Sequence, residues 1–359
     1  MTTYADLQAV PIKQIWQQLR ALRSQKIGRA AKGDRQNTFN AALEQAEQLF
    51  TAGSTVGTAT QPILLFYGLS QLGRAIAAAS TELDNSEYRL SGHGISDQLN
   101  GAASQGLAQV PVRGGGKGAF PVVAKALKAS PMSQELPLGD IWGLLPDAER
   151  FALPGDAGLQ RLILEPEAPH IMRGSECARG RLYPLPVGLQ VSVKDPSVGR
   201  DVIPGEEIEE EHQLLRKHLE PYPSLAGWRL PDPAGRIPYQ RGSYGSETWL
   251  HVPTAFPKSA PESEKAALAG RATEYRGILS VYPKLDDSNL PAHPFLLWWA
   301  VLFTLSRLAR YEPNVWLKLT SVSEDPSAVP IEYILNEAIK AVPELALSAI
   351  LSVSAMNVS

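Results

Sequence analysis

Two apolar segments stand out in the pattern of hydrophobic and polar positions along the chain. In residues 61–80, leucine and isoleucine recur every three or four positions, with small residues between them. Pro62 suits the first turn of a helix. Residues 294–311 contain the longest apolar run, FLLWWAVLFTL. The spacing predicts that both segments are helices that bury most of their surface.

Helical patterns also occupy the rest of the two ends. Ile15, Trp16 and Leu19 share one helical face, and a similar pattern continues to about residue 50. Near the other end, residues 329–341 have helical spacing, with Pro330 placed to start the helix and Pro343 to end it. We therefore expect helices at both ends of the chain.

The middle of the chain, from about residue 155 to 285, has a different pattern. Prolines and glycines separate short apolar runs at 159–164, 189–193, 248–252 and 278–282. Such runs are typical of short β-strands. Between them, residues 206–219 begin with acids and end with bases, as a helix with a favourable dipole would.

These patterns predict an α+β fold that is mainly α. A helical body built from the N- and C-terminal helices would carry a β-rich middle insertion. We divide the chain into an N-terminal helical part (1–150), the insertion (151–288) and C-terminal helices that complete the body (289–359). The stretch 101–120, rich in Gly, Ala and Ser, is expected to be an exposed loop.

The composition indicates the class of protein and its expected location, but it says little about an activity. Apolar residues make up 44% and charged residues 20%, with a net charge of −3, which excludes a disordered or strongly basic chain. Cys177 is the single cysteine, so no internal disulfide forms. We expect a cytoplasmic protein without a signal peptide. The longest apolar run is too short to cross a bilayer, so no membrane association is expected.

Three common catalytic or cofactor templates do not fit. Gly114–Gly118 contains Lys117 but has neither the spacing nor the Ser/Thr of a phosphate loop. Gly68–Gly73 has one residue too many for a nucleophile elbow and lies in a predicted helix. One cysteine and six scattered histidines do not supply a zinc site. We therefore expect neither a cofactor nor a metal.

A row of basic residues near the N-terminus has two interpretations. One residue in three is basic from Arg20 through Arg23, Lys26 and Arg29 to Lys32. Such a row can contact the phosphates of a nucleic acid. A solvated helix face is the alternative, and the sequence leaves both open.

Three motifs carry a resemblance to a known family. Phe66–Ser70, followed by Gly92–Ile95, resembles the N-terminal signature of YaaC-like proteins. Leu308–Pro313 with Trp316 resembles their C-terminal signature, Arg-Tyr-x-Pro followed by Trp. The resemblance makes Tyr67, Arg310, Tyr311 and Trp316 the motif residues to locate. The family has no firmly assigned activity, so the likeness implies kinship more than mechanism.

The predicted helix pair at about 61–100 also resembles, more faintly, HEPN domains. These helical bundles often act as dimeric ribonucleases through an Arg-x4–6-His motif. That resemblance implies His93 as acid or base, with Arg74 or Arg89 on the phosphate. Only three residues separate Arg89 from His93, which departs from the motif.

Two hypotheses of function follow. The preferred one is a non-catalytic binding or accessory protein that acts through a second copy, another protein or a nucleic acid. The HEPN resemblance adds a role in bacterial antiviral defence. The alternative is a HEPN-like, metal-independent ribonuclease that uses His93 with Arg74 or Arg89. The sequence does not decide whether the protein is an enzyme.

Overall fold

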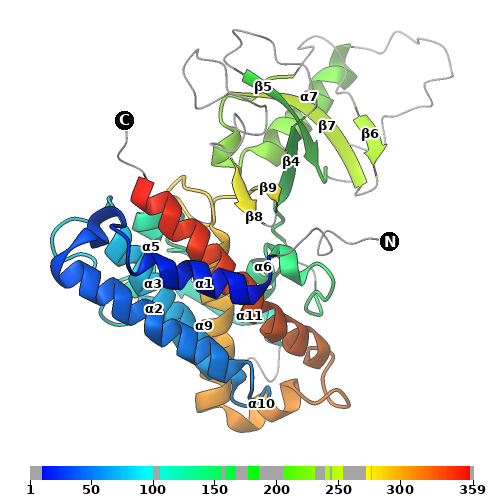
Figure 1. Ribbon diagram of the computed structural model, residues 1–359. Coiled ribbons are helices and arrows are strands. Elements are labelled where there is room, and N and C mark those ends of the chain that lie inside the picture. The colour runs from blue at the N-terminus through cyan, green and yellow to red at the C-terminus, as the bar shows by residue number, and fades with distance from the viewer. Residues whose placement is uncertain are drawn as a thin grey trace. The chain divides into compact units, whose positions relative to one another are not determined.

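A computed structural model describes the fold over most of the chain (Figure 1). The described residues are 10–99, 106–155, 158–166, 177–185, 205–230, 239–242, 245–253, 272–275 and 277–355. The chain forms two compact units. The first combines residues 1–160 with residues 285–359, and the second comprises residues 161–284.

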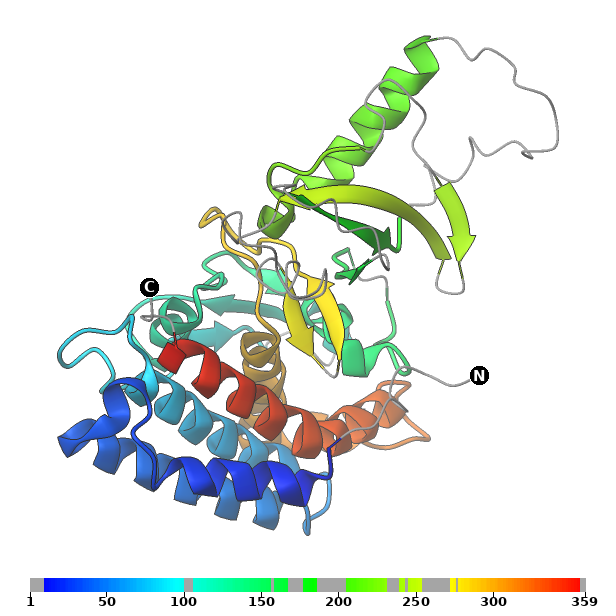
Figure 2. The ribbon, with the colours of Figure 1, turned by 45° about the horizontal axis from the view of Figure 1, so that its top comes forward.

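Helices from both ends of the chain build the first unit (Figure 2). Its helices are α1 (Ile12–Leu22), η2 (Gly28–Ala31), α2 (Gly33–Gly53), α3 (Gln61–Ala79), η3 (Leu107–Gln109), α5 (Ala119–Leu127), α6 (Leu138–Gly143), η4 (Pro146–Ala148), α9 (Pro294–Tyr311), α10 (Pro313–Leu319) and α11 (Ala328–Ala355). A small antiparallel sheet has the order β1 (Ile95–Asp97), β2 (Pro111–Gly114) and β3 (Leu136–Pro137). The predicted fold class, α+β and mainly α, is confirmed.

Helix α3 lies in the core of this unit, packed against α2, α9 and α11. Its glycines allow the neighbouring helices to come close. A Cβ atom at Gly68 would overlap the ring of Phe50 from α2, and one at Gly73 would overlap the indole of Trp299 from α9. Because these positions lack side chains, two large aromatic rings pack directly on the α3 backbone.

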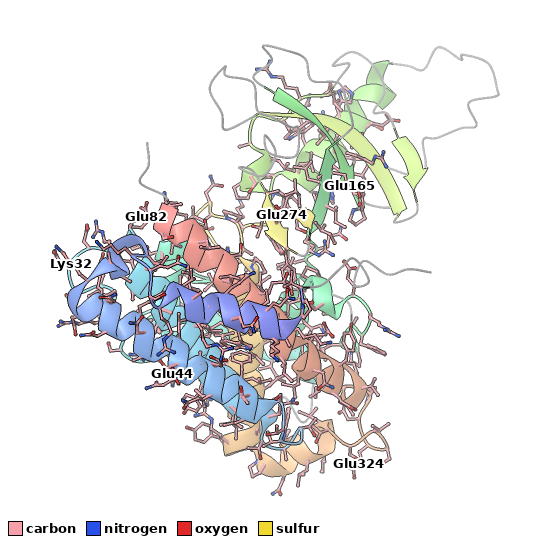
Figure 3. The ribbon with its side chains drawn as sticks, in the orientation of Figure 1. Lys32, Glu44, Glu82, Glu165, Glu274 and Glu324 are labelled. Carbon is pink, nitrogen blue, oxygen red and sulfur yellow. The ribbon has the colours of Figure 1, made fainter. Side chains whose placement is uncertain are left out.

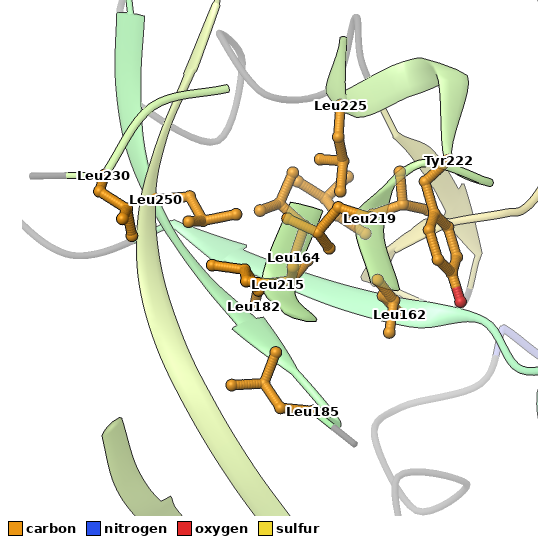
Figure 4. Packing of buried hydrophobic residues seen from close by; sticks show 12 residues of the cluster. Leu162, Leu164, Leu182, Leu185, Leu215, Leu219, Tyr222, Leu225, Leu230 and Leu250 are labelled. Carbon is orange, nitrogen blue, oxygen red and sulfur yellow. The ribbon is translucent and has the colours of Figure 1, made fainter. Parts of the chain in front are cut away.

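The second unit is an antiparallel sheet with a helix packed on it. Its elements are β4 (Leu162–Pro166), β5 (Cys177–Tyr183), α7 (Gly205–Leu219), η6 (Pro223–Leu225), β6 (Tyr239–Gly242), β7 (Gly245–Pro253), β8 (Thr273–Tyr275) and β9 (Ile278–Val281). The strand order is β6-β7-β5-β4-β9-β8. Leu215 and Leu219 of α7 meet Leu162, Leu164 and Leu250 of the strands in a buried cluster (Figure 4).

Most predicted elements are present with shifted limits. The strands expected at 159–164, 248–252 and 278–282 correspond to β4, β7 and β9, and the expected acidic helix is α7. The strand expected at 189–193 lies outside the described residues. The insertion spans 161–284 as a compact unit, where the sequence led us to expect 151–288.

Two local predictions are wrong. Helix α11 does not end at Pro343 but continues to Ala355. Proline removes one backbone hydrogen bond, yet the following turns bury Leu345, Ile350 and Val353, and this burial outweighs the loss. The stretch 101–120 is also not simply an exposed loop.

The part of 101–120 that the structure describes is ordered and largely packed. It contains η3 and β2, and it reaches the start of α5. Val110, Val112 and Phe120 are buried. Alternation over 110–114 was the signal for a strand, and the surrounding glycines obscured it.

Within the described part of the chain, two helices are long and apolar enough to cross a membrane, namely α3 and α11. Both bury most of their residues inside the helical unit, and core helices pass the same test, so the observation is weak evidence for a membrane. The expected cytoplasmic location stays a prediction.

Substituting Gly73 tests the packing of α3 against α9. At an open helix position, Gly→Ala stabilises by about 1 kcal/mol. In Gly73→Ala the new methyl group meets the buried indole of Trp299, so we expect a net destabilisation of about 1–2 kcal/mol in urea unfolding. Gly57→Ala is the control, because a Cβ there meets nothing within 4 Å. A more stable Gly73→Ala variant would contradict this packing.

Candidate functional site

Three segments that are far apart in the sequence meet at one end of α3 and α9. The ring of Phe66 on α3 lies 5.6 Å from that of Phe303 on α9, measured between centroids. The ring of His93 lies 5.4 Å from Phe66 and 6.0 Å from Phe303. The turn at 92–94 therefore packs where α3 and α9 meet. We call Tyr67, His93, Arg307, Arg310 and Tyr311 the motif cluster.

Arg310 occupies the middle of the motif cluster and is held by two hydrogen bonds. Its Nε donates to the backbone oxygen of Ser306 at 3.1 Å, and its Nη1 donates to the hydroxyl of Tyr67 at 2.9 Å. The guanidinium carbon lies 5.5 Å from the ring centroid of Tyr67 and 5.0 Å from that of Tyr311. Among the described residues, no carboxylate forms an ion pair with Arg310. The guanidinium is thus oriented, while its charge is not neutralised by a direct partner.

The two tyrosines leave part of their rings open to solvent. Tyr311 is 62% exposed and Tyr67 is 39% exposed. Tyr311 stands at the last position of α9, where the helix ends before Pro313. Aromatic rings so exposed are unusual on a helix that is otherwise buried, and they offer flat surfaces next to a cation.

Arg307, one turn before Arg310, is paired with a buried acid. Its Nη1 lies 2.9 Å from Oδ1 of Asp97 on β1, whose side chain has no exposed surface. Burial raises the pKa of Asp97 to about 6, although the Arg307 guanidinium opposes that rise. Arg307 also lies 5.7 Å from the Tyr311 ring centroid. Arg307 therefore contacts the ring of Tyr311. Because Asp97 is its ion-pair partner, Arg307 is less available to bind a ligand than Arg310 is.

A tight turn of glycines presents His93. Gly92 and Gly94 have positive φ angles of 64° and 68°, which L-residues avoid. The backbone oxygens of Gly92 and His93 accept hydrogen bonds from the first amides of α5, Ala119 N at 3.2 Å and Phe120 N at 2.9 Å. His93 is therefore held at the surface by its backbone. These bonds also occupy the amides that would otherwise be free to bind an anion at the start of α5.

The protonation of His93 is set by its surroundings. Partial burial lowers the pKa of His93, and the charges of Arg310 and Arg307 lower it further. The imidazole is therefore neutral at pH 7. It packs on apolar rings, and no carboxylate bonded to it is among the described contacts.

The two arginines expected beside His93 are used elsewhere or make no described contact with it. Arg89 donates to Asp34 at 2.7 Å and to the hydroxyl of Tyr88 at 3.3 Å. Arg74 lies partly buried on α3, and its Nε has no hydrogen-bond partner in the part of the chain that the structure describes. The charges that act on His93 are those of Arg310 and Arg307 instead.

A family comparison covers the segments that contain these motifs. The model of the family described as YaaC-like Protein matches residues 6–175 and 215–350. The chain belongs to the YaaC-like family. No curated protein and no solved structure matches the chain.

The basic row of the YaaC-like chain is largely paired with acids. Arg20 lies 3.5 Å from Glu47, Arg23 bonds to Glu44, and Arg29 lies 2.8 Å from Asp84. Figure 3 labels Glu44 on α2 and Lys32 just before that helix. No ion pair of Lys26 or Lys32 is among the described contacts. Nucleic-acid binding by this row stays a prediction. Fewer of its basic side chains are free of ion pairs than the sequence suggests.

Trp316, the last motif residue of the YaaC-like signature, has a structural position. Its ring is buried, and its Nε1 donates to the backbone oxygen of Thr58 at 3.2 Å. This bond holds α10 against the loop between α2 and α3. Trp316 therefore has a structural role and offers almost no surface to a ligand.

Asp97, Phe303 and Arg307 are residues of the site that lie outside the motifs. Asp97 lies in a strand of three residues, which has no periodic pattern, and Phe303 resembles any other core residue of α9. Within the described residues, no group of three or more His, Cys, Asp or Glu side chains could hold a metal ion.

The pH dependence of stability tests the environment of Asp97. Its folded-state pKa, about 6, lies above the usual 3.8, so this group stabilises the fold at low pH and loses that contribution as pH rises through 6. The loss is about 3 kcal/mol at most. Relative to the wild type, Asp97→Asn should therefore gain stability between pH 4 and pH 7 in urea unfolding.

Asp34→Asn is the matched control with the opposite sign. Hydrogen bonds from Tyr88 and Arg89 lower the pKa of exposed Asp34, so its contribution is present above pH 4 and is lost in acid. That variant should lose stability relative to wild type as pH rises. If Asp97→Asn behaved like Asp34→Asn, the pKa of Asp97 would be lowered in the folded protein, and burial would not be the dominant influence on this carboxyl.

Proposed function

We propose that this YaaC-like protein is a non-catalytic binding protein that recognises an anionic partner through the motif cluster. One observation carries the proposal: Arg310 is fixed by Ser306 and Tyr67, yet among the described residues no acid forms an ion pair with it, and Asp97 acts on it only at longer range. Each hydrogen bond to a charged group contributes about 1.5–3 kcal/mol when the geometry is good. An oriented guanidinium is therefore suited to bind an oxyanion.

The anchoring of Arg310 lowers the entropic cost of binding. A free arginine side chain loses about 0.5–1.5 kcal/mol of conformational freedom when a ligand immobilises it. Here the folded protein has already restricted the side chain with its two hydrogen bonds and the rings of Tyr67 and Tyr311. Arg307 is not proposed to bind the anion, because it forms an ion pair with Asp97.

The surroundings of His93 favour binding over catalysis. A general acid or base is normally oriented by a second polar group. His93 instead packs on Phe66 and Phe303. Its role in the proposal is to form one wall of the site.

A metal-independent ribonuclease is the second candidate function, and the neutral protonation state of His93 is the observation that favours it. The imidazole is exposed and has a lowered pKa beside two arginines, so it is available as a base at pH 7. In this version Arg310 takes the place of Arg74 or Arg89. A role in bacterial antiviral defence rests on the HEPN resemblance alone, and housekeeping genes beside this one would count against it.

Titration calorimetry with pyrophosphate tests the proposed anion site. We expect Arg310→Met to weaken binding by about tenfold or more, because it removes the oriented donors. Arg20→Met is the matched control, since Arg20 is an exposed arginine on α1 that pairs with Glu47. Equal affinities of wild type and Arg310→Met would contradict the proposal.

A cleavage assay separates the two candidate functions. Labelled RNA incubated with the wild-type protein in EDTA should remain intact if the protein only binds. RNA cleavage that His93→Ala abolishes would overturn the non-catalytic proposal and favour the ribonuclease.

A further inference from the structure

The motif cluster places two different kinds of surface next to each other. One is the cationic edge of Arg310, and the other is formed by the open rings of Tyr311 and Tyr67, 62% and 39% exposed. The guanidinium carbon lies 5.0 Å and 5.5 Å from these two ring centroids. A simple anion would bind the guanidinium of Arg310 and make no use of the exposed tyrosine rings.

We infer that the motif cluster binds a nucleotide unit, with its phosphate on Arg310 and its base stacked on Tyr311. The inference rests on the proposed anion-binding function and names the chemical class of the ligand. A guanidinium matches the geometry of phosphate oxygens, and an exposed aromatic ring accepts any nucleobase by stacking. The two groups are close enough for one nucleotide to reach both.

The position of Tyr311 makes its ring suitable as a stacking platform. Arg307 lies over the ring at 5.7 Å and is itself fixed by Asp97 at 2.9 Å. Arg310 contacts the same ring. Two oriented cations thus restrict the ring, while Tyr311 as a whole stays 62% exposed. A restricted ring loses less freedom when a base stacks on it.

An acidic peptide is a poorer match to the same surface. Its carboxylates would satisfy Arg310, but they would leave the open rings of Tyr67 and Tyr311 without a partner. Base stacking uses those rings and contributes about 1–3 kcal/mol per base. A base that is paired and stacked in a duplex is not available for such contacts. The ligand is therefore a free nucleotide or a nucleotide of a single strand, and the two share the same chemistry.

Fluorescence anisotropy with a labelled oligothymidylate of about twelve nucleotides tests this inference. UMP and pyrophosphate serve as unlabelled competitors. We expect Tyr311→Ala to weaken oligonucleotide binding by about tenfold and Tyr311→Phe to stay within about twofold, because stacking needs the ring and not the hydroxyl. Leu351→Ala is the control, since Leu351 is 48% exposed on α11. Circular dichroism verifies that each variant is folded.

The competitors distinguish the sources of the nucleotide. UMP that competes better than pyrophosphate but less well than unlabelled oligonucleotide assigns the site to a single strand. UMP that competes as well as the oligonucleotide assigns it to a free nucleotide. Both results support the inference if they depend on Tyr311.

Three results would overturn it, and they separate it from the proposed function. If pyrophosphate competes as well as UMP and Tyr311→Ala has no effect, the anion site stands and the nucleotide inference fails. If neither phosphate nor oligonucleotide binds, both fail. Self-association that Tyr311→Ala abolishes, without nucleotide binding, would assign the rings to a second copy of the chain.

Discussion

The close packing of α3 against α9 is the constraint on which the rest of the helical unit depends. Gly73 leaves room for the indole of Trp299, so the two helix backbones approach closely. Where the helices reach the motif cluster, Phe66 and Phe303 continue the contact as an aromatic pair 5.6 Å apart. Both helices bury most of their residues, so each depends on its neighbours in the unit for stability.

The motif cluster is a direct consequence of this packing. Tyr67 is on one helix and Arg310 on the other, and their hydrogen bond joins residues 243 positions apart. The turn at 92–94 completes the site because Gly94 fits closely against Gly118, and because the backbone oxygens of Gly92 and His93 accept hydrogen bonds from the first amides of α5. A polar group at the rim of a dense apolar core is held in one orientation, and this property is what a binding site requires.

Much of the fold was predictable because burial leaves a periodic pattern. The apolar spacing in residues 61–80 and 294–311 predicts α3 and α9, and the family motifs indicate which of their ends to examine. The same pattern does not predict which side chains pair in the folded protein. Nothing local indicates that Asp97 pairs with Arg307 or that Arg89 is occupied by Asp34, since these partners are distant in sequence. Pro343 was misread because proline weakens a helix locally, whereas burial along the rest of α11 stabilises it.

A double-mutant cycle between Tyr67 and Arg310 tests the central claim most directly. Urea unfolding of Tyr67→Phe, Arg310→Met and the double variant would measure the coupling free energy between the hydroxyl and the guanidinium. If α3 and α9 pack as described, the coupling should be about 0.5–1.5 kcal/mol, the range of a hydrogen bond at a partly exposed site. Additive effects, with a coupling near zero, would show that the two helices do not bring these residues together.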